Sequence, residues 1–181
     1  MTTQDFTTTI LVDQTPNEVF NSINNVRKWW SEEIEGQTKN LNDVFNYHFE
    51  DIHRCQIKII ESIADKKIVW RVLDNYFKPG IFEDPSRTVD KTNHIHHEKA
   101  EWVDTTISFE ITKKNDETQI RFTHHGLVPA YECFDVCSNG WSHYIRQSLF
   151  NLITSGKGEP NSTGNAKTID EEKLQSAAGR A

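Results

Sequence analysis

The sequence predicts an α+β fold in which a curved antiparallel β-sheet wraps around one long C-terminal helix. Three observations support this prediction. Residues 44–125 contain short runs in which apolar and polar residues alternate, as they do in half-buried strands. Residues 131–155 change to steps of three, four and seven, which is typical of an amphipathic helix. No helical pattern separates the later strands, so a doubly wound α/β sheet is not expected.

The composition is that of one soluble domain with a net charge of -7 over 181 residues. Such a charge argues against nucleic acid or an anionic membrane as a partner. No apolar run approaches the length of a membrane span, and the first residues lack the basic start and apolar core of a signal peptide. The three cysteines, Cys55, Cys133 and Cys137, lack disulfide-framework spacing, so we expect reduced thiols and a cytoplasmic protein.

The N-terminal segment predicts a strand followed by two short helices. Apolar and polar residues alternate over residues 6–12, with many β-branched side chains. Thr15 then fits a helix N-cap, Pro16 suits the first helical position and Glu18 completes a capping box. A second short helix is expected over residues 26–30.

Two adjacent tryptophans end this second helix. Trp29 and Trp30 cannot share one helix face, because neighbouring residues project about 100° apart. We therefore expect one of them to enter the core and the other to cover an edge or the mouth of a pocket.

Five further strands are expected from residue 44 onward, each with one apolar face. Polar turns at 64–67 and 115–117 predict an antiparallel meander with one dry face. The inward positions are Phe45, Tyr47 and Phe49; Cys55, Ile57 and Ile59; Ile68, Trp70 and Val72; Ile107, Phe109 and Ile111; and Ile120, Phe122 and His124.

Two segments fall outside this regular pattern. Residues 76–100 follow neither period and contain His94, His96 and His97, so we expect a long loop or lid. Residues 159–181 are rich in Ser, Gly, Asn, Ala and charge, which predicts a disordered or weakly helical tail. The expected folded domain is therefore 1–158.

The long helix expected over residues 131–155 carries one broad apolar stripe. Gly156 follows the last periodic residue and is expected to be a left-handed stop. Gly140, in mid-helix, costs about 1 kcal/mol relative to Ala, so either another element approaches closely there or this face roofs a cavity. The stripe consists of Phe134, Trp141, Ile145, Leu149 and Leu152, widened by Tyr144, Ser148 and Ile153.

Several motifs occur together in a characteristic order. They are strand 8–12 followed by TPNEVF at 15–20, the pairs Trp29-Trp30 and Val69-Trp70, strands 107–111 and 120–124, GLVP at 126–129, and the final helix. In this order they resemble the SRPBCC or START-like superfamily, also called helix-grip or birch-pollen-allergen-like. Within it, the chain looks most like the small bacterial proteins similar to the C-terminal domain of the activator of the 90-kDa heat-shock protein ATPase.

This resemblance implies a hydrophobic cavity between the curved sheet and the last helix, used without a cofactor. Members bind lipids, sterols, polyketides and other apolar ligands, and some are cyclases or aromatases. The same side chains could instead fill the core to normal density and leave no void. The residues expected to line the cavity are Trp29, Trp30, Tyr47, Trp70, Phe109, Phe122, His124, Trp141, Tyr144, Ile145 and Ser148.

Catalytic and metal sites are weaker hypotheses. His124 faces inward among apolar residues and could act as a general base, but no orienting carboxylate has a suitable spacing, so no catalytic residue is predicted. The histidines of 94–97 and the helical pair Cys133 and Cys137 lack the CxxC or HExxH spacing of zinc sites, so no metal site is predicted. Cys137 near a helix start could have a lowered pKa, but nothing else supports covalent catalysis.

The sequence thus predicts binding of a small hydrophobic ligand, lipid-like or aromatic, rather than catalysis. One alternative is a cofactor-independent cyclase or hydrolase that uses the same cavity. The other is a protein-interaction module of the co-chaperone kind, or a homodimer, with a filled core and an exposed apolar patch.

Overall fold

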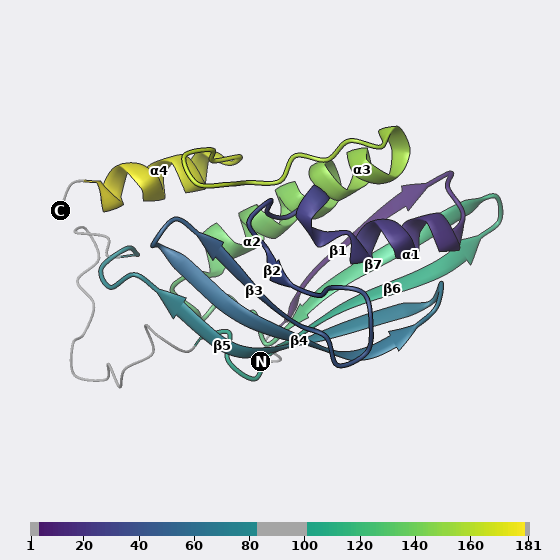
Figure 1. Cartoon of the computed structure of the whole chain (residues 1–181), viewed down its shortest axis with the longest axis horizontal. Coiled ribbons are helices and arrows are strands. Elements are labelled where there is room, and N and C mark those ends of the chain that lie inside the picture. The colour runs from purple at the N-terminus through teal and green to yellow at the C-terminus, as the bar shows by residue number, and fades with distance from the viewer. Residues whose placement is uncertain (1–3, 83–100, 180–181) are drawn as a thin grey trace.

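The structure confirms the α+β class, because one seven-stranded antiparallel sheet curves around a long helix (Figure 1). This computed structural model describes residues 4–82 and 101–179. The order across the sheet is β1-β7-β6-β5-β4-β3-β2, so β3 to β7 form the expected meander and β1 pairs with β7. The strands are β1 Phe6–Val12, β2 Glu35–Gly36, β3 Val44–Phe49, β4 His53–Ile63, β5 Lys67–Phe77, β6 Thr106–Lys114 and β7 Glu117–His125.

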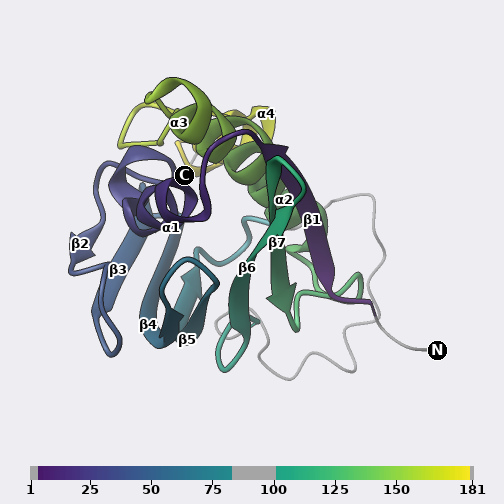
Figure 2. The same cartoon turned by 90° about the vertical axis from the view of Figure 1, so that its right-hand side faces the viewer.

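The long helix lies across the concave face of the sheet, which bends around it in the end-on view (Figure 2). It consists of three consecutive parts, α2 Phe134–His143, η4 Tyr144–Leu149 and α3 Phe150–Ser155. The middle part, η4, is a π-helical turn, which the apolar periodicity did not predict. Gly156 ends the helix with φ 82°, which confirms the predicted left-handed stop. Within the described residues, no helix is long and apolar enough to cross a membrane.

A side chain from the loop before β6 caps the start of α2. The helix begins at Phe134, three residues later than the start of the expected range. The Glu101 carboxylate accepts hydrogen bonds from the backbone N–H groups of Glu132 at 3.0 Å and Cys133 at 3.4 Å. A carboxylate is favourable there because it satisfies N–H groups without helical partners and complements the helix dipole.

The two N-terminal helices follow their predicted signals. Helix α1 Pro16–Asn24 begins with the capping box between Thr15 and Glu18. The second helix, η1 Val26–Lys28, is a short 3₁₀ turn that stops two residues before the predicted end. Both helices cover the sheet beside α3 (Figures 1 and 2).

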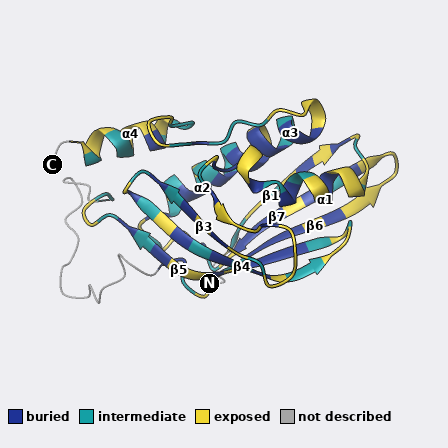
Figure 3. Ribbon diagram, viewed as in Figure 1, coloured by how far each residue is buried: buried dark blue, intermediate teal, exposed yellow. Residues whose placement is uncertain are grey.

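The core lies between the concave face of the sheet and the long helix (Figure 3). Trp29 is fully buried in it, stacked on Trp70 with ring centroids 6.2 Å apart and edge-on to Phe109 at 6.0 Å. Trp30 is also buried in this core, and it lines a pocket as well. Both neighbouring tryptophans therefore enter the core, which the sequence had predicted for one of them, and Trp30 in addition borders the pocket.

The predicted loop at 76–100 starts too early. Tyr76 and Phe77 continue β5, where they pair with Arg54 and His53 of β4. The chain then turns at Lys78, whose backbone N–H donates to the Ile52 carbonyl at 2.8 Å. Positions 83–100 of the predicted loop, which include His94, His96 and His97, lie outside the residues that the structure describes.

For the described part of 159–181, a disordered tail is wrong, and the helical alternative agrees with the structure at Ile169–Ala178. Residues 158–165, here called the strap, run back beside η1, and Asn161 in the strap is fully buried. The strap leads into helix α4 Ile169–Ala178, which has a capping box between Thr168 and Glu171. The composition argument failed because it counted apolar residues, whereas hydrogen bonds hold this segment.

The two glycines at 140 and 158 predict opposite responses to an added methyl group. A Cβ at Gly140 would have no atom within 4 Å, so Gly140→Ala should stabilise the protein by about 1 kcal/mol in urea unfolding. The matched Gly158→Ala should destabilise it, because its Cβ would overlap the Lys28 carbonyl. A loss of stability in Gly140→Ala would contradict the open space at this position.

Candidate functional site

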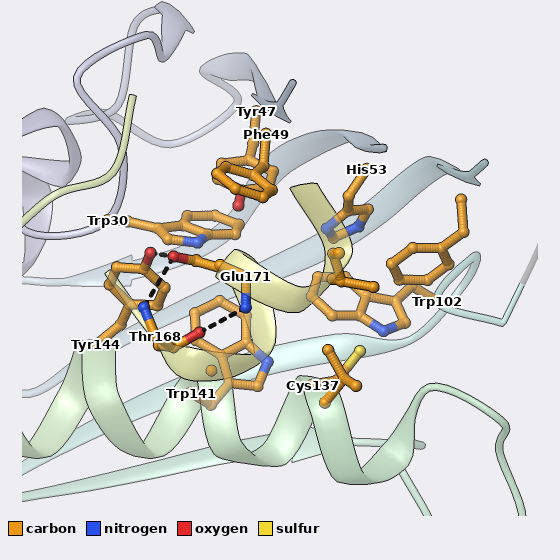
Figure 4. Close-up of a pocket in the computed structure, with 14 residues that line it drawn as sticks. Trp30, Tyr47, Phe49, His53, Trp102, Cys137, Trp141, Tyr144, Thr168 and Glu171 are labelled. Atoms are coloured by element: carbon orange, nitrogen blue, oxygen red, sulfur yellow. Dashed lines mark hydrogen bonds between the residues drawn. The ribbon is translucent and has the colours of Figure 1, made fainter. Parts of the chain in front are cut away.

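A pocket lies at one end of the interface between the sheet and the long helix, beneath α4 (Figure 4). It has a free volume of about 60 Å³. Its walls come from the inner face of β3 to β5, the chain after η1, the loop before β6, α2 with η4, and α4. The lining residues are Trp30, Tyr47, Phe49, His53, Phe77, Trp102, Val136, Cys137, Gly140, Trp141, Tyr144, Thr168, Glu171 and Leu174.

Aromatic rings make up most of the wall. Trp30 stacks on Tyr47 with ring centroids 4.2 Å apart and tilts against Trp141 at 4.9 Å. Trp141 in turn stacks on Trp102 at 5.8 Å. These rings are held rigidly by one another, so they present a largely apolar surface with fixed shape.

One end of the pocket is polar, because Glu171 of α4 reaches into it (Figure 4). Its Oε1 accepts a hydrogen bond from the Tyr144 hydroxyl and another from Asn161 Nδ2 at 3.2 Å. Its Oε2 accepts from the backbone N–H groups of Lys167 at 2.6 Å and Thr168 at 3.2 Å. A buried carboxylate is costly unless it is hydrogen-bonded, and four donors meet that requirement here.

Asn161 of the strap connects this carboxylate to two tyrosines. Its Nδ2 also donates to the hydroxyls of Tyr47 at 3.1 Å and Tyr144 at 2.8 Å. Burial, followed by neighbouring charge, raises the pKa of Tyr47 and of Tyr144 well above the ordinary value for a phenol. Both hydroxyls therefore stay protonated and available as donors at physiological pH.

His53 of β4 is a second polar group in the wall. Its Nε2 lies 2.9 Å from Asn75 Oδ1, and its ring stacks on Phe77 at 4.1 Å. Because the amide oxygen can only accept, Nε2 carries the proton. Burial lowers the pKa of His53 to about 4, so the imidazole is neutral at physiological pH.

His124, the candidate general base, lies behind the pocket wall with both ring nitrogens occupied. The Thr105 hydroxyl donates to the Trp102 carbonyl at 2.6 Å, so it accepts from His124 Nε2 at 2.8 Å. His124 Nδ1 accepts from Trp141 Nε1 at 3.1 Å. This is a neutral imidazole that joins β7 to the long helix, and it has no free nitrogen for a substrate proton.

Four of the eleven residues expected to line a cavity do line this pocket. They are Trp30, Tyr47, Trp141 and Tyr144. The other seven are buried in the packed interior, namely Trp29, Trp70, Phe109, Phe122, His124, Ile145 and Ser148. The packed-core alternative therefore describes most of the interface, and the pocket is confined to one end. Alternation identifies the inward face of a strand, but it does not indicate which part of that face is covered.

Ser148 was expected to line a cavity but belongs to the packed interior. Its hydroxyl donates to the Trp29 carbonyl at 2.7 Å and accepts from the backbone N–H of Glu159 at 2.7 Å. It therefore ties the long helix to the chain after η1 and to the strap. A bulky substitution at Ser148 would break this junction rather than fill the pocket.

Ten lining residues were not among those expected. Phe49 and His53 carried a usable signal, since both continue the inward alternation of their strands. Thr168 and Glu171 also carried one, because their spacing is that of a capping box. Leu174 follows from that helix, since it lies one turn after Glu171.

The three cysteines are buried and free. Cys133 and Cys137 lie one turn apart at the start of α2 and are free thiols. A hydrogen bond to Cys137, together with burial, raises the pKa of Cys133, so its thiol stays protonated. Over residues 4–82 and 101–179, no three histidine, cysteine or acidic side chains gather as a metal site.

The chain has the helix-grip fold of several solved structures. No protein-family model and no curated protein matches it by sequence. The solution structure of the Aha1 dimer from Colwellia psychrerythraea aligns with TM-score 0.62 and 18% identity, over 86% of this chain and 99% of that one.

Two proteins with related names share the fold. CalU16 from Micromonospora echinospora aligns with TM-score 0.54 and 11% identity, over 96% of this chain and 85% of that one. DynU16, from the dynemicin biosynthetic locus, aligns with TM-score 0.56 and 11% identity, over 86% of this chain and 49% of that one. At these identities the likeness establishes the fold, and function has to be argued from the site.

Two histidines with lowered pKa values, the partly buried His53 and the fully buried His124, predict that the protein loses stability in acid. Their pKa values are lowered to about 4 for His53 and about 3 for His124, against about 6.5 in an unfolded chain. Below pH 6.5 the unfolded chain therefore binds protons that the folded protein does not, and stability falls as the pH falls. Urea unfolding between pH 7.5 and 5 should show this slope.

Replacing one histidine should reduce that slope by about 1.4 kcal/mol per pH unit, which corresponds to one proton. His124→Gln and the double variant with His53→Gln should flatten it stepwise. An unchanged slope in the double variant would contradict neutral burial of these side chains.

Proposed function

We propose that this protein binds a small hydrophobic ligand, lipid-like or aromatic, in the pocket between the sheet, the long helix and α4. The supporting observation is the pocket itself, whose wall is mostly aromatic and whose polar groups gather at one end. Such an arrangement buries an apolar body and orients one polar group. The proposal places the protein in the cytoplasm, which agrees with three free, buried cysteines.

The polar groups of the pocket favour binding over catalysis. His53 donates through Nε2 to Asn75 and is neutral, and Glu171 is already hydrogen-bonded by four donors. A cyclase or hydrolase using the same pocket is the second candidate. Turnover of an extracted ligand by the purified protein would favour it.

A protein partner or a second copy of the chain is the third candidate. It draws support from the dimeric solved structure with the same fold. Several large apolar side chains are also exposed, including Leu11 and Ile63 on the sheet and Ile169 on α4. Light scattering at micromolar concentration would distinguish a dimer from a monomer.

The deciding experiment is native mass spectrometry of the protein purified from its own host, followed by organic extraction. We expect a reproducible apolar molecule bound at one per chain. An empty protein that also fails to bind an environment-sensitive apolar dye would contradict the proposal and favour an interaction module.

Filling the pocket should weaken dye binding. Gly140 lies in the pocket wall with open space beside it, so Gly140→Leu should lower the dye affinity about tenfold or more, equivalent to a lost anchor of a binding site. Ser138→Leu, two residues away and outside the lining, is the matched control and should bind dye as the wild type does. Fluorescence titration measures both, and equal loss in the two variants would point to binding elsewhere.

A further inference from the structure

The Glu171 carboxylate occupies the polar end of the pocket as an internal ligand would. Its Oε1 is bound by the Tyr144 hydroxyl and by Asn161 Nδ2, and neither donor belongs to α4. Tyr144 is part of the long helix. Asn161 is fixed to the chain after η1, because its N–H donates to the Trp30 carbonyl at 3.0 Å and its carbonyl accepts from Glu32 at 2.9 Å.

These donors would therefore remain in place if α4 moved away. Tyr47 would remain as well, since it belongs to β3 and accepts from Asn161 Nδ2. Removing the carboxylate would leave the buried Tyr144 hydroxyl without its acceptor, whereas Asn161 Nδ2 would keep the two tyrosine hydroxyls as acceptors. Buried donors without a partner are costly, so the vacated position favours another oxygen acceptor.

Helix α4 is attached in a way that permits such a movement. Its apolar contacts are few: Leu174 and Ala178 are partly buried, while Ile169 is 70% exposed. Polar contacts at the surface supply much of the rest, with Gln175 Nε2 donating to Glu50 at 2.7 Å and Asn139 Nδ2 to Asp170 at 2.9 Å. A helix with few buried apolar contacts opens at low free-energy cost.

The pocket is also too small to enclose a longer ligand unless α4 moves. Its free volume of about 60 Å³ is far below the roughly 300–1,000 Å³ of pockets that enclose drug-sized ligands. Thr168, Glu171 and Leu174 all line the pocket from α4, so displacement of this helix enlarges it.

We propose that the pocket binds a hydrophobic carboxylic acid, whose carboxylate replaces that of Glu171 against Tyr144 and Asn161 while α4 is displaced. This inference rests on the proposed function and specifies its ligand class. It also makes α4 an internal competitor, which lowers the affinity of the intact chain for its ligand. A tethered group of this kind acts at an effective concentration on the order of millimolar.

Calorimetric titration of the full-length protein with octanoate and with 1-octanol tests the inference, because the two probes share a chain and differ in the head group. Glu171→Ala should bind octanoate about tenfold more tightly than the wild type does, since the internal competitor is gone. The same variant should bind octanoate about tenfold more tightly than octanol, because hydrogen bonds to a charged acceptor are the stronger ones.

Thr168→Ala is the matched control for loosening α4. It removes the acceptor of the Glu171 backbone N–H, at 3.0 Å, but keeps the carboxylate, so its gain in octanoate affinity should be much smaller. Adding Tyr144→Phe to Glu171→Ala should abolish the preference for octanoate over octanol. In the wild type, saturating octanoate should accelerate hydrogen exchange of the α4 amides.

The outcomes separate this inference from the proposed function. If Glu171→Ala bound octanoate and octanol with equal affinity, the inference of a carboxylic acid ligand would be wrong, and the proposal of a hydrophobic pocket would stand. If neither probe bound the wild type or any variant, while tryptophan fluorescence showed that the proteins were folded, both the inference and the proposed function would be wrong. If Thr168→Ala and Glu171→Ala gained the same octanoate affinity, the gain would come from loosening α4, and competition by the Glu171 carboxylate would be ruled out.

Discussion

A seven-stranded sheet must bury the apolar side of its concave face against little more than one helix. At the end near α1, large rings solve this problem by packing directly on one another, as Trp29, Trp70 and Phe109 do. At the other end the rings of Trp30, Tyr47 and Trp141 line a pocket instead of closing on one another completely.

The strap and α4 complete this arrangement with polar contacts. Asn161 and Glu171 are both buried, and they are tolerated because each takes part in one hydrogen-bond cluster with Tyr47 and Tyr144. Such a cluster specifies one position for the segment more than it adds stability, since each net hydrogen bond contributes little. The same cluster places the Glu171 carboxylate among aromatic rings, and the proposed ligand would put its own carboxylate at that position.

The histidines and tyrosines in and behind the pocket wall share one electrostatic tendency. Burial lowers the pKa of His53 and His124 and raises that of Tyr47 and Tyr144, so each of these groups is held in its neutral form. Neutral donors and acceptors in a dry wall orient a ligand well. They are poorly matched to proton transfer near neutral pH, which requires a pKa close to that of the medium.

The sequence by itself determined six of the seven strands, all but β2, together with the capped α1 and the helix stop at Gly156. These features depend on local spacing and on single-residue conformational preference, both of which are visible in one chain. Tertiary structure alone decided which inward residues border the pocket and which fill the core. It also decided that Glu171, near the start of α4, reaches Tyr144. Such contacts join residues far apart in the chain, and no local pattern specifies which distant side chain meets which.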